Sequence, residues 1–160
     1  MLQIRIICVG KLKERFYADA VAEYEKRLFP FCRLEMIELP EERLGDRPKT
    51  SETAAALERE RDRIERQLLR DAKLICLCVE GGQMTSEAFS ELLSSCEASG
   101  HPRICLVIGG SFGLSETLKK KADLRLSMSR MTFPHHLARV MLLEQLYRGF
   151  QIKEGTKYHK

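Results

Sequence analysis

The ionisable side chains that could carry chemistry gather at the end of the chain. Tyr158 and His159 stand immediately before the last residue, Lys160. A phenol and an imidazole are both side chains that move protons in enzyme reactions. Chain ends are usually polar and dispensable, so two interpretations stay open at this point. The pair belongs either to a frayed tail or to a working site.

Charge is distributed unevenly along the chain. The 160 residues carry a formal net charge of +4. The segment from Thr117 to Lys160 holds ten Lys and Arg against three Asp and Glu, so the rest of the chain is slightly acidic. A basic end on a near-neutral domain is typical of a site for a polyanion such as RNA. A solvated basic surface with no ligand is an equally good interpretation of charge alone.

Three loops could form a binding site together. Each follows a stretch that is expected to be a strand, and they are residues 80–83, 109–115 and 128–133. In open parallel sheets, ligands bind beyond the carboxyl ends of the strands. All three loops lie in the second half of the chain, so we expect them to converge on one crevice.

The second loop invites a comparison with dinucleotide-binding loops. Gly109, Gly110 and Gly113 follow a strand and precede a helix, which is the right context. The spacing G-G-x-x-G differs from G-x-G-x-x-G, and the loop follows the fourth strand instead of the first. A nicotinamide oxidoreductase is therefore disfavoured, although it stays an alternative. The glycines fit a turn with positive φ, against which a ligand could also lie.

The final helix contains three further polar candidates. His135 and His136 begin it, and histidines there are more often hydrogen-bonding caps than catalysts. They lack acidic neighbours at ligand spacing, so no metal is predicted. Arg139 is either a long side chain lying along a rim or a contact to the substrate. Glu144 and Arg148 are four residues apart and are expected to pair.

The six cysteines contain no C-x-x-C pair. Cys76 and Cys78 are two apart in a strand-like run, so they point to the same face without the turn that zinc pairs need. Small buried hydrophobic residues in the reducing cytoplasm are the better interpretation. No apolar run is long enough to cross a bilayer, and the first nine residues do not resemble a signal peptide.

The elements that must position these residues alternate along the chain. Strands are expected at residues 2–9, 33–39, 74–79, 104–108 and 124–127. Helices are expected at residues 14–29, 50–70, 86–98, 115–122 and 134–150. Ser86 and Ser115 are predicted N-caps, and Gly81-Gly82 is expected to end the third strand. The alternation predicts one α/β domain over residues 1–160 with a mostly parallel sheet.

The last helix is apolar on nearly every side. The apolar side chains are Leu137, Val140, Met141, Leu142, Leu143, Leu146, Tyr147 and Phe150. A helix of this kind is buried on more than one side. At the edge of a chain of this length, the pattern predicts a partner subunit, most simply in a two-fold homodimer.

Several segments together resemble a known family. They are Val9–Lys13, Ala22–Tyr24, Val107–Leu114 (VIGGSFGL), Leu126–His135 (LSMSRMTFPH), Arg139–Arg148 (RVMLLEQLYR) and Tyr158-His159. The chain is similar, end to end, to the ribosomal large-subunit RNA pseudouridine N3-methyltransferases of the SPOUT (α/β-knot) superfamily. This resemblance implies S-adenosylmethionine as methyl donor, a deep trefoil knot in the C-terminal third, and a dimer packed through the last helix.

The resemblance also implies roles for individual residues. It places cofactor contacts at Leu77, Gly109, Met128, Ser129, Arg130, Met131, Thr132 and Phe133. Tyr158 and His159 are expected to be catalytic and to complete the site of the partner subunit, and Arg139 to position the RNA or its base. The expected substrate is ribosomal RNA in an assembled ribosome. A non-catalytic, ribosome-associated RNA-binding protein is the alternative.

Overall fold

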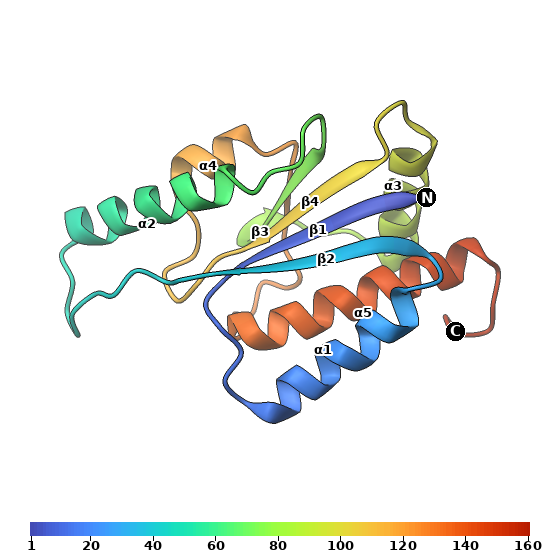
Figure 1. Cartoon of the computed structure of the whole chain (residues 1–160), viewed down its shortest axis with the longest axis horizontal. Helices are drawn as coiled ribbons and strands as arrows, with labels where there is room; N and C mark the ends of the chain where they lie inside the picture. Colours follow the sequence, from blue (N-terminus) through green and yellow to red (C-terminus); the bar gives the residue numbers. More distant parts are fainter.

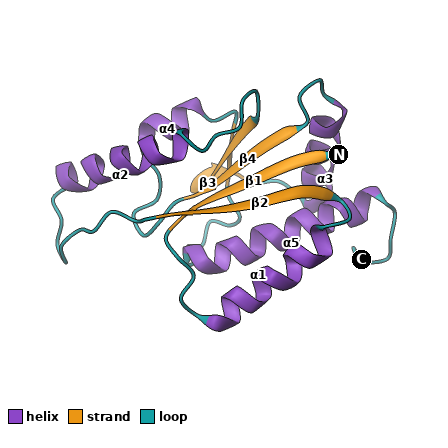
Figure 2. Ribbon diagram, in the orientation of Figure 1, coloured by secondary structure: helices purple, strands orange, loops and turns teal.

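Five parallel strands alternate with five helices in the computed structural model, which describes residues 1–160 (Figures 1 and 2). The strands are β1 (Leu2–Val9), β2 (Cys32–Leu39), β3 (Lys73–Gly82), β4 (Arg103–Ile108) and β5 (Leu124–Leu126). The helices are α1 (Arg15–Leu28), α2 (Thr50–Glu65), α3 (Ser86–Ala98), α4 (Glu116–Lys121) and α5 (His135–Lys153). The strands lie in the order β2-β1-β4-β3-β5, and every pairing is parallel. The predicted single α/β domain with a parallel sheet is therefore confirmed.

Helices cover both faces of the sheet, which explains why the inner strands are apolar throughout. In β1, Ile4 and Ile6 face one hydrophobic cluster, whereas Ile7 and Val9 face the other. Successive side chains of a strand point to opposite faces, so a strand covered on both sides must be apolar at every position.

The larger cluster lies between the sheet and helices α1, α3 and α5. Helix α5 packs against both α1 and α3, and Leu142, Leu143 and Leu146 are fully buried. Ser90 of α3 donates a 2.6 Å hydrogen bond to the carbonyl of Gly149 in α5. The neighbours of α5 within one chain thus account for much of its apolar surface, and the homodimer stays a prediction.

The smaller cluster lies on the opposite face, under α2 and α4, where Ile64 and Leu118 are buried. Helix α2 was expected to reach residue 70, but it ends at Glu65. The chain turns there because Arg5 of β1 draws the carbonyl of Gln67 into a 2.7 Å hydrogen bond. Asp71 completes the turn with a φ of 57°. A tertiary contact has overridden the helical tendency of the sequence.

The region after Cys78 also departs from expectation. The third strand was expected to end at Val79, before Gly81-Gly82, but β3 includes both glycines and ends at Gly82, with a register shift against β5. A Cβ on Gly81 would lie 2.8 Å from the backbone of Arg125, so only glycine permits this close pairing. The next helix is capped by Thr85, one residue before the predicted Ser86; its hydroxyl accepts a hydrogen bond from the Ala88 N–H.

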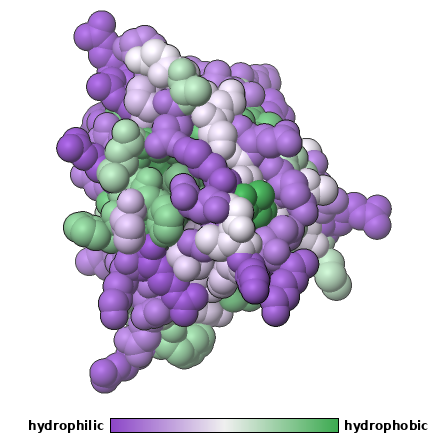
Figure 3. Space-filling model, turned by 90° about the vertical axis from the view of Figure 1, so that its right-hand side faces the viewer, coloured by the Kyte–Doolittle hydropathy of each residue, from purple (hydrophilic) through white to green (hydrophobic).

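The outer surface is mainly polar. On the face that carries the N-terminus and the C-terminal tail, hydrophilic residues surround smaller groups of hydrophobic ones (Figure 3). No helix combines the length and apolar character that a membrane span requires.

Candidate active site

A cavity of about 660 Å³ lies beyond the carboxyl ends of β3, β4 and β5. The wall residues include Glu80 from the first predicted loop, Gly109 to Leu114 from the second, and Met128 to Phe133, except Arg130, from the third. The expected convergence on one crevice is therefore confirmed for the second and third loops, whereas Glu80 reaches the cavity from strand β3, which continues to Gly82. The volume falls in the range of about 300–1,000 Å³ that is typical of small-ligand sites.

Seven of the eight predicted cofactor residues line this cavity. They are Leu77, Gly109, Met128, Ser129, Met131, Thr132 and Phe133. Arg130 is not among the lining residues, although its neighbours on both sides are. Val79, Phe112 and Met131 are large exposed hydrophobic residues in the cavity wall. Exposed apolar side chains around a hollow are typical of a binding site.

The glycine-rich turn after β4 is held very tightly. A Cβ on Gly109 would lie 2.3 Å from the carbonyl oxygen of Gly113, so Gly109 is required for close approach. Gly113 itself has a φ of +82°, as a glycine turn predicts. From outside, the carboxylate of Glu41 accepts a 2.7 Å hydrogen bond from the Ser111 N–H. Glu41 belongs to the charged stretch before α2, where the sequence gives no sign of a link to this turn.

Two charged residues of the cavity wall are paired with each other. Lys119 is 9% exposed and forms ion pairs with Glu80 and Glu116. The hydrogen bond from Lys119 holds the pKa of Glu80 below its usual range, so this carboxylate is ionised at neutral pH. The wall therefore contains an ion pair whose two charges are already engaged within the protein. The sequence pattern did not single out either residue.

His135 also lines the cavity, and burial lowers its pKa, so its ring is neutral near pH 7. His136 lies instead beside Glu14, with Nδ1 3.7 Å from the carboxylate. The prediction that these histidines cap the last helix is wrong. Pro134 occupies the N-cap position, and no side chain bonds to the free N–H groups there.

Arg139 is buried, with 2% of its surface exposed, so it is not a rim residue. Its guanidinium donates a 2.7 Å hydrogen bond to Glu38 and a 3.2 Å bond to the carbonyl of Gly10. The same Glu38 oxygen accepts a 3.0 Å bond from the Leu12 N–H. Together these bonds fix the loop between β1 and α1. The contact between Arg139 and RNA stays a prediction.

The C-terminal tail folds back onto its own chain. The Tyr158 hydroxyl donates a 3.1 Å hydrogen bond to Glu144. Arg148 lies 3.2 Å from Nδ1 of His159, whose Nε2 lies 2.7 Å from Glu87. Arginine can only donate, so Nδ1 accepts and the Nε2–H donates to the carboxylate. The tail is thus held by specific contacts, and it does not line the 660 Å³ cavity of its own chain.

The predicted pair of Glu144 and Arg148 is confirmed at 2.7 Å. Glu144 also accepts a hydrogen bond from its neighbour Gln145. This carboxylate therefore joins the tail to the exposed side of α5.

The cysteines behave as small hydrophobic residues. Five of the six are buried, and Cys78 is partly buried. Burial raises the pKa of Cys8 and of Cys76 to about 12, so both stay neutral thiols. No group of three or more potential ligand side chains is placed to hold a metal ion.

Comparison with known proteins identifies relatives that are named as methyltransferases. The family model described as "Predicted SPOUT methyltransferase" matches residues 2–159. The chain is 43% identical over 159 residues to a protein of Streptococcus pyogenes serotype M5 (strain Manfredo) named "Ribosomal RNA large subunit methyltransferase H". It is 44% identical to a protein of the same name from Streptococcus equi subsp. zooepidemicus (strain MGCS10565). Each alignment covers 99% of this chain and 100% of the relative.

A solved structure shares the fold at low sequence similarity. It is described as a probable methylase family protein from Haemophilus influenzae Rd KW20 and is 12% identical, with a TM-score of 0.55. The match covers 98% of this chain and 70% of that one. The family model and the two streptococcal relatives span this chain almost end to end, and the chain is therefore a member of the SPOUT methyltransferase family.

Proposed function

We propose that the protein uses S-adenosylmethionine to methylate N3 of a pseudouridine in large-subunit ribosomal RNA, within an assembled ribosome. The observation that carries this proposal is the 660 Å³ cavity, whose walls include the two segments, Val107–Leu114 and Leu126–His135, that carry the resemblance to the family. The names of the streptococcal relatives support the ribosomal substrate. A cytoplasmic location follows from that substrate.

The lining of the cavity fits S-adenosylmethionine. Leu77, Leu126 and Phe133 provide an apolar surface for an adenine ring, and the turn at Gly109 exposes backbone that a ring edge could approach. Glu80 and Lys119 form an ion pair in the wall, and the amino and carboxylate groups of the methionine part could join this pair as further charged partners. When bound, the cofactor supplies a methyl group on a sulfonium sulfur, which leaves as a neutral thioether once the acceptor nitrogen attacks.

The contribution of the protein to such a displacement is mainly positional. Donor and acceptor must be held close and in line, which can supply several kcal/mol of the barrier reduction. The close approach at Gly109 and the hydrogen bond from Ser111 to Glu41 hold the short turn after β4, which supports such a positional role. Arg139 fixes the neighbouring loop through Gly10, and in this proposal it positions the RNA or its base through that loop.

The acceptor imide must lose a proton, and the tail is our candidate for this step. Tyr158 and His159 are the catalytic pair in this proposal, and they act in the site of a partner subunit in a homodimer packed through α5. General acid–base catalysis of this kind typically contributes roughly 10²- to 10⁴-fold. The deep trefoil knot of the C-terminal third is part of the same proposal.

Binding of RNA is assigned to the basic C-terminal segment. Contacts between Lys or Arg and phosphates make affinity fall as salt rises. A single α/β domain of this size would depend on the folded ribosomal RNA for specificity. Equal activity on short naked RNA and on ribosomal subunits would argue against that part of the proposal.

The central test measures transfer of labelled methyl groups from S-adenosylmethionine to purified large ribosomal subunits lacking the modification. The wild-type chain should label one pseudouridine, which mass spectrometry of nuclease fragments would identify. His159→Ala should lower turnover strongly, whereas His101→Ala, on an exposed loop, should not. Unchanged turnover in His159→Ala would remove the tail from the mechanism.

Cofactor binding by calorimetry separates the proposal from the non-catalytic alternative. A ribosome-binding protein without activity would not bind S-adenosylmethionine. A thermal-shift comparison with NAD addresses the oxidoreductase, because a ligand stabilises the folded state to which it binds.

A further inference from the structure

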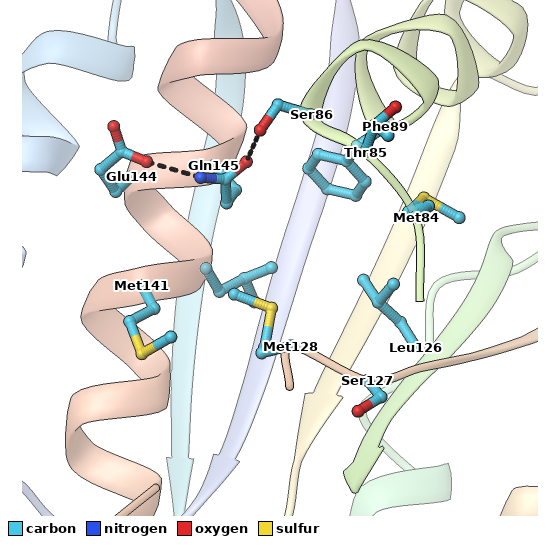
Figure 4. A pocket seen from close by; sticks show the side chains of 11 residues that line it. Met84, Thr85, Ser86, Phe89, Leu126, Ser127, Met128, Met141, Glu144 and Gln145 are labelled. Carbon is cyan, nitrogen blue, oxygen red and sulfur yellow. Dashed lines mark hydrogen bonds between the residues drawn. The ribbon is translucent and has the colours of Figure 1, made fainter. Parts of the chain in front are cut away.

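A second cavity, of about 330 Å³, adjoins the first (Figure 4). It lies between the start of α3, the exposed side of α5 and the chain just after β5. The wall consists of Met84, Thr85, Ser86, Phe89, Leu126, Ser127, Met128, Met141, Leu142, Glu144 and Gln145. Leu126 and Met128 belong to both cavities. A molecule in one cavity would therefore lie next to a molecule in the other.

The polar part of this wall is a short chain of hydrogen bonds. The Ser86 hydroxyl donates a 2.7 Å bond to Oε1 of Gln145, and Nε2 of Gln145 donates a 2.8 Å bond to Glu144 (Figure 4). A carboxylate cannot donate, so the amide must present its NH₂ group to Glu144. The orientation of the Gln145 amide is thereby fixed before any ligand arrives.

The fixed amide keeps unused hydrogen-bonding capacity. Its oxygen has two lone pairs and its nitrogen two hydrogens, and one of each is engaged within the protein. One acceptor and one donor therefore stay free on the same group. This pattern complements an adjacent N–H and C=O of a pyrimidinedione ring, the base type that carries an imide.

The apolar part of the wall suits a flat ring. Figure 4 shows Phe89 and the thioether side chains of Met84, Met128 and Met141 around the space that Gln145 borders. Proteins that act on a single base take it out of its stack, hold it between apolar or aromatic side chains and read its edge by hydrogen bonds. Both requirements meet in this cavity.

The C-terminal tail lies against the same wall. Tyr158 of the same chain bonds to the Glu144 carboxylate that also holds Gln145, so the tail supports this wall. Neither Tyr158 nor His159 lines the second cavity, and in the proposed dimer the catalytic pair would come from the tail of the partner subunit.

We infer that the second cavity binds the acceptor base, a pyrimidinedione flipped out of the RNA, and that the Gln145 amide reads its N–H and C=O pair. Ser86 is a positioning residue that holds the amide. This inference rests on the proposed function and adds the subsite for the substrate. Methyl donor and acceptor would then meet beside Met128, which lines both cavities.

Kinetics on large ribosomal subunits test the inference. Gln145→Ala and Ser86→Ala should each slow single-turnover methyl transfer, by about tenfold or more for the loss of hydrogen bonds to the base. Their affinity for S-adenosylmethionine in calorimetry should match that of the wild type. Ser95→Ala, an exposed serine further along α3, is the matched control. Wild-type rates in both variants, with an active wild type, would overturn the inference and leave the proposed function standing.

The methionines allow a test on the unaltered protein. With ¹³C-methyl methionine, pseudouridine 5′-monophosphate should shift the signals of Met84 and Met141, whereas S-adenosylmethionine should shift that of Met131. Met36 lines neither cavity and is the internal control. Nucleotide shifts at Met131 instead, or none at Met84 and Met141 up to the solubility limit, would contradict the inference. A chain without any response to S-adenosylmethionine would contradict the proposed function.

Discussion

Arg139 and Glu38 are 101 positions apart in the sequence, yet a 2.7 Å hydrogen bond joins their side chains. The arginine is almost fully buried, whereas 37% of the Glu38 side chain is exposed. The two partners therefore differ in what their removal leaves behind. Without Glu38 a buried cation loses its partner, and without Arg139 the carboxylate can still be hydrated.

That asymmetry gives the first prediction. Glu38→Ala should lower the free energy of unfolding by about 3 kcal/mol, and Arg139→Met by about 1–2 kcal/mol. The double variant should lose less stability than the two single variants combined, because neither charge is left without its partner. Urea unfolding of the wild type, the two single variants and the double variant measures all three losses of stability. Equal costs in the two single variants would show that the pair is effectively solvated.

Gly109→Ala should disrupt the turn after β4. The added methyl group would overlap the Gly113 carbonyl, so we expect a loss of about 1–3 kcal/mol of stability. Affinity for S-adenosylmethionine should fall as well, because the turn forms one wall of the cavity. Gly100→Ala has open space around its Cβ and should stay within about 0.5 kcal/mol of the wild type. Calorimetry and urea unfolding report the two effects separately.

The neutral His135 gives a prediction about pH. Burial first, then the charges of His136 and Arg139, lower its pKa, and Glu41 partly opposes this. The unfolded chain therefore binds the proton more readily, so stability falls as pH drops from about 6.5 towards the lowered value. A protonated ring in the wall should also repel the cationic cofactor.

We expect the affinity for S-adenosylmethionine to weaken about fivefold through this window, equivalent to roughly 1 kcal/mol of repulsion. His135→Gln should remove the pH dependence, whereas His136→Gln should retain it. Calorimetry between pH 7 and pH 5 provides the comparison. A pH dependence that survives in His135→Gln would assign it to another group.

Deletion of residues 158–160 should leave the fold intact and abolish methyl transfer. The contacts of the tail to Glu144, Arg148 and Glu87 are partly exposed, so their loss should cost about 1 kcal/mol or less. The thermal unfolding midpoint and the oligomeric state should therefore change little. Removal of Lys160 alone is the control, and normal activity in the longer deletion would overturn the catalytic role of the tail.

Local patterns were sufficient to predict the five strands, apart from the extension of β3 to Gly82, the placement of the second and third loops, and the cap at Ser115. The apolar run of β4 reflects cover on both faces, and parallel strands bring their following loops to one edge. Each of these features depends on residues close together in the chain. The resemblance added the residues of the cavity wall.

Features that depend on distant residues could not be predicted in this way. The early end of α2 follows from a bond between Arg5 and Gln67, and the support of the glycine turn comes from Glu41. The burial of Arg139 depends on its hydrogen bond to Glu38, a residue that no local pattern connects with it. In each case the residue that determines the structure is many tens of residues away in the sequence. The periodicity of a local segment cannot reveal such a contact.

The position of α5 has a consequence for how the protein forms. This helix follows every other helix and strand in the sequence, yet it fills the middle of its layer, between α1 and α3. The larger core therefore cannot close until α5 has been synthesised. Contacts between residues so far apart in sequence slow folding. We expect the nascent chain to keep apolar surfaces of β1 and β4 uncovered until α5 is available, so that it depends most on chaperones at that stage.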